Sequence, residues 1–400
     1  MTKQDPEVQR QERWRTAQRV VVKLGTSIVT GEGGNICSER IEPLVRSMAA
    51  LKRAGRQVVL VSSGAVGLGA GRLGLHQSRL QDIVVRQACA AIGQSMLMHA
   101  YEQLFRARDV KIAQVLLTED DFVDFSRYTN LRRTIEKLLK LGVLPIINEN
   151  DTVSTAELEY RETSTESSQE RVFGDNDRLA ALVMSKLEAD ALVLLSNVDG
   201  LLLHNPASRQ NKDKGRPEVI PLVEEFTDSL KAIAQGPSAG GRGGMLTKLE
   251  AAQIAMRSGG VCVIANGNTP DILDRIFAGE QIGTTFISTS RMAGKRRWIS
   301  FAAGVRGRVI VNEGARVAIM GGKASLLASG VMRVEQQFAP QDVVSIVDSD
   351  GREFARGIIN CASEEASAMI QSREIRSSSQ AGDRSRVLVT RNNLVLTERR

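Results

Sequence analysis

The sequence places two lysines beside glycine-rich turns, a combination suited to phosphate chemistry. Lys248 closes the stretch Gly240-Gly241-Arg242-Gly243-Gly244-Met245-Leu246-Thr247-Lys248, and Lys23 follows an apolar run and precedes Gly25. Glycines let backbone N–H groups approach an anion closely, and a helix that begins at such a turn points its unpaired N–H groups at that anion. We therefore expect Lys23 and Lys248 to take part in the transfer of a phosphoryl group.

A helix is expected directly behind the glycine-rich stretch. Four apolar residues recur there at helical spacing, so that one stripe contains Leu246, Leu249, Ala252 and Met256. Lys248 then falls in the first turn, where it adds a mobile positive charge near the positive end of the helix dipole.

Short polar clusters follow other apolar runs. They are Ser62-Ser63-Gly64, Asn148-Glu149-Asn150-Asp151, Gly174-Asp175-Asn176-Asp177 and Ser196-Asn197-Val198-Asp199-Gly200. Helix N-caps and Asx turns would explain each cluster by itself. Because several of them follow predicted core strands, we expect the two Asn/Asp clusters to bind a polar substrate and to orient the lysines, and the last cluster to line a nucleotide pocket.

The elements that position these residues alternate between strands and helices over the first 290 residues. The expected strands are 20–24, 57–61, 111–117, 143–148, 191–196 and 260–265, and the expected helices are 39–54, 80–108, 127–141, 176–188 and 246–258. Such alternation predicts an α/β fold, a three-layer α/β/α sandwich with a mainly parallel sheet. Ligands of such sheets bind beyond the carboxyl ends of the strands, where the polar clusters lie.

The remaining chain has a different sequence pattern, which predicts a small β-rich barrel domain. Short β-like runs occur at 309–311, 316–319, 331–334, 343–347, 354–359 and 387–389. We therefore divide the chain into a polar N-terminal extension (1–18), an α/β domain (19–290), a basic linker (291–305) and a β-rich domain (306–393). Residues 157–171, which are rich in Glu, Ser and Thr, predict a surface loop.

Composition limits the class of protein. The four cysteines are scattered without a CxxC pair, which argues against a zinc knuckle or a redox pair. No apolar run is long enough to cross a membrane and the N-terminus carries no apolar signal core, so a cytoplasmic location is expected. The net charge of +7 includes an acid-free cluster at Arg291, Lys295, Arg296, Arg297, Arg306 and Arg308, which suits either a solvated linker or a nucleic-acid surface.

Six motifs in order resemble the glutamate 5-kinases of the amino acid kinase superfamily. They are VVVKLGTS, VSSGAVGLG, INENDTVST, FGDNDRLAAL, LLSNVDGL and GRGGMLTKLEAA, and the resemblance covers residues 19–298. The segment from Gly307 to Ala315, with Ser325–Leu327 and Gly330-Val331, resembles the PUA domain that many bacterial members carry. No Walker-type GxxxxGK[ST] sequence is present, which argues against a P-loop fold.

The resemblance implies phosphorylation of the γ-carboxylate of L-glutamate by ATP and Mg²⁺, the first step of proline biosynthesis. It implies catalytic roles for Lys23, Lys248 and Asp177, with Asp177 holding the lysines. Glutamate would contact Ser63, Asp151 and Asn176. ATP would contact Lys23, Ser196, Asn197, Arg242, Gly243, Gly244, Met245, Leu246, Thr247 and Lys248. The resemblance does not identify protein residues that bind the metal ion.

The resemblance also implies a homo-oligomer, a dimer or tetramer, and a hand-off of the product to glutamyl phosphate reductase. The chain departs from the family at Ser196-Asn197, where Thr-Asp is frequent, at Arg242, where Thr is usual, and in a longer segment between Asp151 and Gly174. Two alternatives remain: a kinase of the same fold that phosphorylates N-acetylglutamate, carbamate or a nucleoside monophosphate, or an RNA-binding protein that acts through the PUA domain.

Overall fold

The protein divides into two compact units. A computed structural model describes residues 5–118, 120–153, 176–203, 218–227, 229–230, 244–287, 294–302, 304–322, 324–375 and 386–397. The first unit comprises Met1–Phe122 and Ser126–Arg291, and the second comprises Val123–Phe125 and Met292–Arg400. Across the described ranges, no helix is long and apolar enough to cross a membrane.

An eight-stranded sheet forms the centre of the first unit, in the order β3-β4-β2-β1-β5-β7-β8-β6. Its strands are β1 (Arg19–Leu24), β2 (Gln57–Ser62), β3 (Ile112–Leu117), β4 (Leu144–Glu149), β5 (Ala191–Ser196), β6 (Leu222–Val223), β7 (Val261–Asn266) and β8 (Thr284–Phe286). All neighbouring strands are parallel except β7 and β8. The central strands are almost fully buried, as expected for parallel strands covered on both faces.

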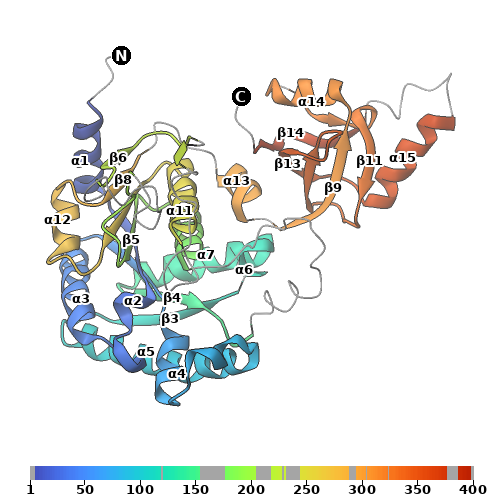
Figure 1. Ribbon diagram of the computed structural model, residues 1–400. Helices are drawn as coiled ribbons and strands as arrows, with labels where there is room; N and C mark the ends of the chain where they lie inside the picture. Colours follow the sequence, from blue (N-terminus) through green and yellow to red (C-terminus); the bar gives the residue numbers. More distant parts are fainter. Residues whose placement is uncertain are drawn as a thin grey trace, which may run out of the picture. The chain divides into compact units, whose positions relative to one another are not determined.

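Helices cover both faces of this sheet. They include α1 (Pro6–Thr16), α2 (Thr26–Val29), α3 (Ser38–Arg53), α4 (Ala65–Arg72), α5 (Ile83–Arg106), α6 (Asp120–Val123), α7 (Phe125–Lys140), α9 (Asn176–Leu187), α11 (Met245–Arg257) and α12 (Ile272–Ala278). One face carries the apolar cluster to which α1, α3, α5 and α12 contribute. Helices α9 and α11 pack against β1, β5 and β7, and Figure 1 shows α11 on the opposite side of the sheet from α3 and α12.

Strand alternation assigns the side chains of β1 to these two faces. Val20, Val22 and Leu24 belong to the apolar cluster with α3 and α5. Because successive side chains of a strand point to opposite faces, Lys23 faces the other layer, the one that contains α9 and α11. The six expected strands of this unit and its five expected helices are all present, with bounds shifted by three residues at most.

The N-terminal segment is more than a polar extension. Asp5 caps α1 by accepting a hydrogen bond from the Glu7 backbone N–H, at 3.0 Å. Trp14 is buried and meets Phe277 of α12 edge to face, with ring centroids 5.6 Å apart. Residues 6–16 are therefore part of the packing of the first unit, which a mostly charged sequence did not indicate.

The second unit contains a curled six-stranded sheet in the order β10-β14-β13-β12-β9-β11. Its elements are α13 (Gly294–Arg297), a π-helical turn (Trp298–Ala302), β9 (Val305–Val311), α14 (Glu313–Met320), β10 (Leu326–Leu327), β11 (Val331–Glu335), β12 (Val343–Val347), β13 (Glu353–Ile359), α15 (Ser363–Ile375) and β14 (Val387–Leu396). The expectation of a strand at 316–319 was wrong. Asn312 caps a helix there, because its side chain accepts from the Ala315 N–H at 2.9 Å, and a four-residue apolar run cannot distinguish strand from helix.

Candidate active site

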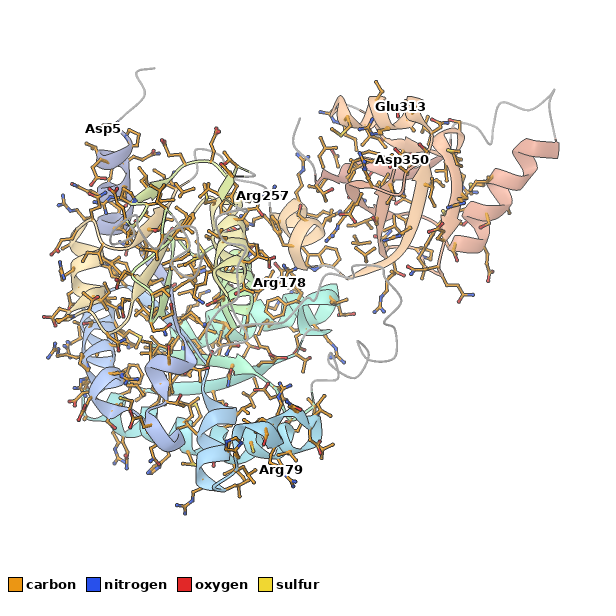
Figure 2. All side chains as sticks on the ribbon, viewed as in Figure 1. Asp5, Arg79, Arg178, Arg257, Glu313 and Asp350 are labelled. Carbon is orange, nitrogen blue, oxygen red and sulfur yellow. The ribbon has the colours of Figure 1, made fainter. Side chains whose placement is uncertain are left out.

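The predicted site residues gather at the carboxyl edge of the first sheet. Lys23 lies near the end of β1, Ser63 follows β2, Asp151 follows β4, and Ser196 ends β5. These strands are parallel, so their carboxyl ends meet on one edge, as in other open α/β sheets. Asn176 and Asp177 are the first residues of α9, and the next residue, Arg178, is labelled in Figure 2. Lys248 lies in the first turn of α11.

Asp177 holds both lysines at the centre of the site. Its carboxylate lies 2.7 Å from the Lys23 Nζ through Oδ1 and 2.9 Å from the Lys248 Nζ through Oδ2. All three side chains are buried, and Asp177 is completely shielded from solvent. Three distant parts of the chain, a strand and two helix starts, therefore meet in one ion cluster. Lys248 is not the mobile charge expected from the sequence, because Asp177 fixes its ammonium group.

The charges of this cluster favour an anion. Burial by itself would raise the pKa of Asp177, but Lys23 and Lys248 outweigh this effect and hold the pKa well below its usual range. Asp177 therefore stays ionised, and these three side chains together carry one net positive charge. A net positive charge in a buried place favours an anion such as the phosphate groups of a nucleotide.

Gly25 and Ser196 shape the space beside Lys23. A Cβ added at Gly25 would lie 3.3 Å from the Leu195 carbonyl oxygen, 3.7 Å from the Ser196 Cβ and 3.8 Å from the Lys23 Nζ. A side chain at position 25 would thus occupy the space between the lysine and the end of β5. The Ser196 Oγ is buried and has no hydrogen-bond partner among the described residues, which leaves it available to a ligand.

The start of α11 differs in part from the expected stripe. Gly244 is the N-cap in an extended conformation, and the Thr247 Oγ1 donates to the Gly244 carbonyl oxygen at 3.0 Å. Leu249, Ala252 and Met256 are buried as expected, but Leu246 is 42% exposed, because it lies in the first turn, where the helix begins at the edge of the sheet. Arg242 and Gly243, which the sequence assigned to ATP, lie outside the described residues, as do Gly174, Asp175, Arg291 and residues 157–171.

A second group of polar side chains adjoins the ion cluster through Asn176. The Asn176 Nδ2 donates to the Ser63 Oγ at 2.8 Å, to the Asn148 Oδ1 at 3.0 Å and to the Ser62 carbonyl oxygen at 3.3 Å. The structure thus joins two of the residues assigned to glutamate, Ser63 and Asn176. The third, Asp151, is half-buried in the turn that follows β4 on the same edge of the sheet.

Two further residues, Gln94 and Tyr101, support this group. The Asn148 Nδ2 donates to the Gln94 Oε1 of α5 at 2.9 Å. The Ser62 Oγ donates to the Ser63 carbonyl oxygen at 3.1 Å and lies 2.8 Å from the Tyr101 Oη. Sequence reasoning did not select Gln94 or Tyr101, because both lie inside a long helix with no polar cluster around them.

Among the described residues, the side chains around the lysines do not form a protein metal centre. Within the described ranges, no three His, Cys, Asp or Glu side chains form a group that could hold a metal ion. Asp177, the acid at the centre of the cluster, is engaged by two ammonium groups. A magnesium ion carried by nucleotide phosphates needs few protein ligands and fits these residues.

Comparison with known proteins places the chain in a family. Residues 18–266 match the amino acid kinase family, and residues 307–377 match the PUA domain. Glutamate 5-kinase from Caldanaerobacter subterraneus subsp. tengcongensis is 46% identical over 349 residues, which are 87% of this chain and 89% of that protein. Glutamate 5-kinase from Myxococcus xanthus is 45% identical over 86% of both chains. Glutamate 5-kinase from Dehalococcoides mccartyi strain CBDB1 is 39% identical over 95% of this chain and 98% of that protein.

The matches cover both the α/β unit and the β-rich unit. All three relatives are glutamate 5-kinases, and each is aligned over most of its own length. The chain therefore belongs to the amino acid kinase family and, within it, to the glutamate 5-kinases.

Proposed function

We propose that the protein transfers the γ-phosphoryl group of ATP to the γ-carboxylate of L-glutamate, forming L-glutamyl 5-phosphate and ADP, the first step of proline biosynthesis. The observation that carries this proposal is the junction at Asn176 and Asp177. Asn176 belongs to a group of amide and hydroxyl side chains that suits an amino acid. Asp177, the next residue, holds the two lysines, which suit a phosphate. Acceptor and donor groups would therefore meet at the start of α9.

The chemistry requires alignment more than proton transfer. A carboxylate oxygen attacks the γ-phosphorus, the bond from that phosphorus to the β–γ bridging oxygen breaks, and ADP leaves with the electron pair. Because glutamate is already ionised at neutral pH, no general base is needed. Lys23 and Lys248 would neutralise charge on the transferred group, while Asp177 holds both ammonium groups in place.

The nucleotide would lie along the edge between β5 and α11. Ser196, Asn197, Gly244, Met245, Leu246 and Thr247 border this region, and Arg242 and Gly243 precede it in sequence. Magnesium bound to the phosphates would neutralise part of their charge. The α11 N-terminus would direct its free N–H groups at a phosphate.

The first experiment measures ADP release from MgATP with L-glutamate, N-acetylglutamate, aspartate and UMP as acceptors, each with and without hydroxylamine. We expect turnover with L-glutamate and formation of the γ-hydroxamate, which reports an acyl phosphate. Turnover with N-acetylglutamate or UMP in place of glutamate would favour another acceptor within the same fold. A protein that binds ATP but turns over none of these acceptors would contradict the proposal.

A second candidate function concerns the C-terminal unit. The match to the PUA domain and the exposed cations Lys295, Arg296 and Arg306 support RNA binding by this unit. Phosphate contacts make such binding strongly dependent on salt. We expect the affinity for a structured RNA to fall as salt rises from about 50 to about 200 mM, with the slope expected for contacts to a few phosphates. Equal affinity at both salt concentrations, or no binding, would argue against it.

Assembly, partners and location stay predictions. We expect a homo-oligomer, transfer of the labile acyl phosphate to glutamyl phosphate reductase, and a cytoplasmic location. Size-exclusion chromatography with light scattering tests the first of them directly.

A further inference from the structure

The direction of the Asn176 amide is fixed by its neighbours. Its Nδ2 faces the Ser62 carbonyl oxygen, which accepts hydrogen bonds and never donates them. The same nitrogen donates to the Ser63 Oγ and to the Asn148 Oδ1. The Asn176 Oδ1 must therefore point the other way, where it is buried and has no partner among the described residues.

The Asn148 amide is fixed in the same manner. Its Oδ1 accepts from the Glu149 backbone N–H at 2.9 Å, so its Nδ2 is the atom that donates to the Gln94 Oε1, at 2.9 Å. With Oε1 engaged, Gln94 must direct its Nε2 elsewhere. That nitrogen is also buried, and the described part of the chain offers it no acceptor.

Close packing of two helices places Gln94 beside the substrate residues. A Cβ on the neighbouring Gly93 would lie 1.8 Å from the Ala65 carbonyl oxygen and 2.7 Å from the Gly69 nitrogen. The backbone of α5 thus touches the first turn of α4, which begins two residues after Ser63. Gln94 therefore lies next to the polar group at the carboxyl ends of β2 and β4.

The two atoms without partners have opposite polarity. A buried polar atom without a partner destabilises the protein, so each of these two atoms would gain from a hydrogen bond to a ligand. The Asn176 Oδ1 is an acceptor and suits an ammonium group, whereas the Gln94 Nε2 is a donor and suits a carboxylate. An α-amino acid carries both groups on one carbon atom.

The order of the polar side chains along the site indicates how the substrate would be oriented. Hydrogen bonds connect Gln94 to Asn148 and Asn148 to Asn176, and Asp177 is the next residue in the chain. The two lysines lie at the Asp177 end of this series. The reacting γ-carboxylate belongs at the lysine end. The α-carboxylate then belongs at the Gln94 end.

We propose that Gln94 is a further substrate-binding residue, whose Nε2 donates a hydrogen bond to the α-carboxylate of glutamate while the Asn176 Oδ1 accepts from its ammonium group. This inference rests on the proposed function. It assigns recognition of the amino acid head group to a helix that none of the sequence motifs includes.

The test is Gln94→Glu, which keeps an oxygen to accept from Asn148 but replaces the donor by a carboxylate. A hydrogen bond to a charged group contributes about 1.5–3 kcal/mol, so we expect KM for glutamate to rise roughly 10- to 100-fold. KM for ATP and kcat should change little, because the lysine cluster is untouched. Lowering the pH protonates the introduced carboxyl group and restores a donor, so KM for glutamate should fall towards the wild-type value.

Matched controls separate this role from a general structural one. Gln103→Glu makes the same change at an exposed position of α5 and should leave every kinetic constant unchanged. Gln94→Met, with a similar volume and no donor, should raise KM for glutamate at every pH, without recovery in acid. Thermal unfolding confirms that each variant is folded, and the Met variant carries the test if the Glu variant does not fold.

The outcomes distinguish the inference from the function on which it rests. A wild-type protein without glutamate-dependent turnover contradicts the proposed function. An active wild type with unchanged KM for glutamate in folded Gln94→Glu or Gln94→Met overturns the role of Gln94 alone. A parallel rise of KM for ATP and glutamate also overturns it, because that result would mean a disturbance of the whole site.

Discussion

At the scale of single residues, Asp177 connects the two halves of the site. Its carboxylate binds the Lys23 and Lys248 ammonium groups, and the residue before it, Asn176, binds Ser63 and Asn148. The sequence supplied the two lysines and the motif that contains Asp177. The role of Asp177 as their common partner came only from the resemblance, because an Asp after Asn at the start of a helix is equally suited to a cap.

Asp177→Asn tests this connection. The change keeps the shape but removes the carboxylate that faces both buried ammonium groups, so we expect a loss of about 3–5 kcal/mol in the free energy of unfolding. Turnover should fall about a hundredfold or more, because both lysines lose their fixed positions. Denaturant unfolding and the hydroxamate assay measure the two effects.

The pH dependence gives this prediction a second readout. Since the folded pKa of Asp177 is lowered, its contribution to stability is present above the unfolded pKa of about 3.9 and is lost as pH falls below it. The Asn variant should lack this loss. The exposed Asp350→Asn, in the other unit, is the control and should behave as wild type.

Lys186 gives a second prediction on pH dependence, with the same sign but at higher pH. Its Nζ lies 3.1 Å from the centroid of the Tyr128 ring. Its pKa is lowered to about 7, mainly by burial and also by the charge of Arg132, while the charge of Glu136 opposes the change. Between pH 7 and about 10.4 the unfolded chain holds a proton that the folded chain has lost, so this group makes stability rise with pH. We expect Lys186→Met to raise Tm more at pH 6 than at pH 9; an equal shift at both values would contradict the lowered pKa.

At the scale of elements, the site depends on a close approach of α4 and α5. Helix α4 contains three glycines in eight residues, a composition that disfavours a helix in isolation. A Cβ on Gly69 would lie 1.9 Å from the Cys89 carbonyl oxygen of α5. The glycines thus let the two backbones touch, and this contact brings Gln94 to the end of β2.

A pair of alanine substitutions in α4 tests this contact. Gly69→Ala would force the helices apart, and we expect it to destabilise the unit by about 1–3 kcal/mol or more and to raise KM for glutamate. At Gly67 an added Cβ meets nothing closer than 3.5 Å, so Gly67→Ala should stabilise the unit by about 0.5–1 kcal/mol. Denaturant unfolding compares the two variants. Equal effects would show that helix propensity, and not the close contact, governs α4.

At the scale of the whole molecule, the chain has two units with separate cores. All described residues of the proposed site lie in the first unit, so we expect the chemistry not to require the second. Trp298 and Ile299 are buried, and the turn that contains them packs against β13 and β14 of the second unit. Trp298 and Ile299 therefore belong to the second unit, whereas the sequence analysis placed them in a linker (291–305) between the two domains.

A chain that ends after Arg291 should retain most of its glutamate-dependent turnover. A chain that ends after Val305 should be less soluble, because Trp298 and Ile299 lose the strands that cover them. Turnover per folded molecule and the fraction of protein remaining in solution measure the two effects. A folded but inactive shorter chain would mean that the second unit takes part in catalysis.

The sequence alone determined the local elements of this protein. Apolar runs bounded by polar turns defined six of the eight strands of the first sheet, and glycines next to lysines indicated phosphate chemistry. Strand burial and anion binding both depend on residues close together in the chain. The prediction of a strand at 316–319 was wrong, because the cap at Asn312 favours a helix there. Only the tertiary structure placed Asp177 between Lys23 and Lys248 and joined Asn176 to Gln94 through Asn148. These contacts depend on strand order and helix crossing, which bring together side chains that are distant in sequence.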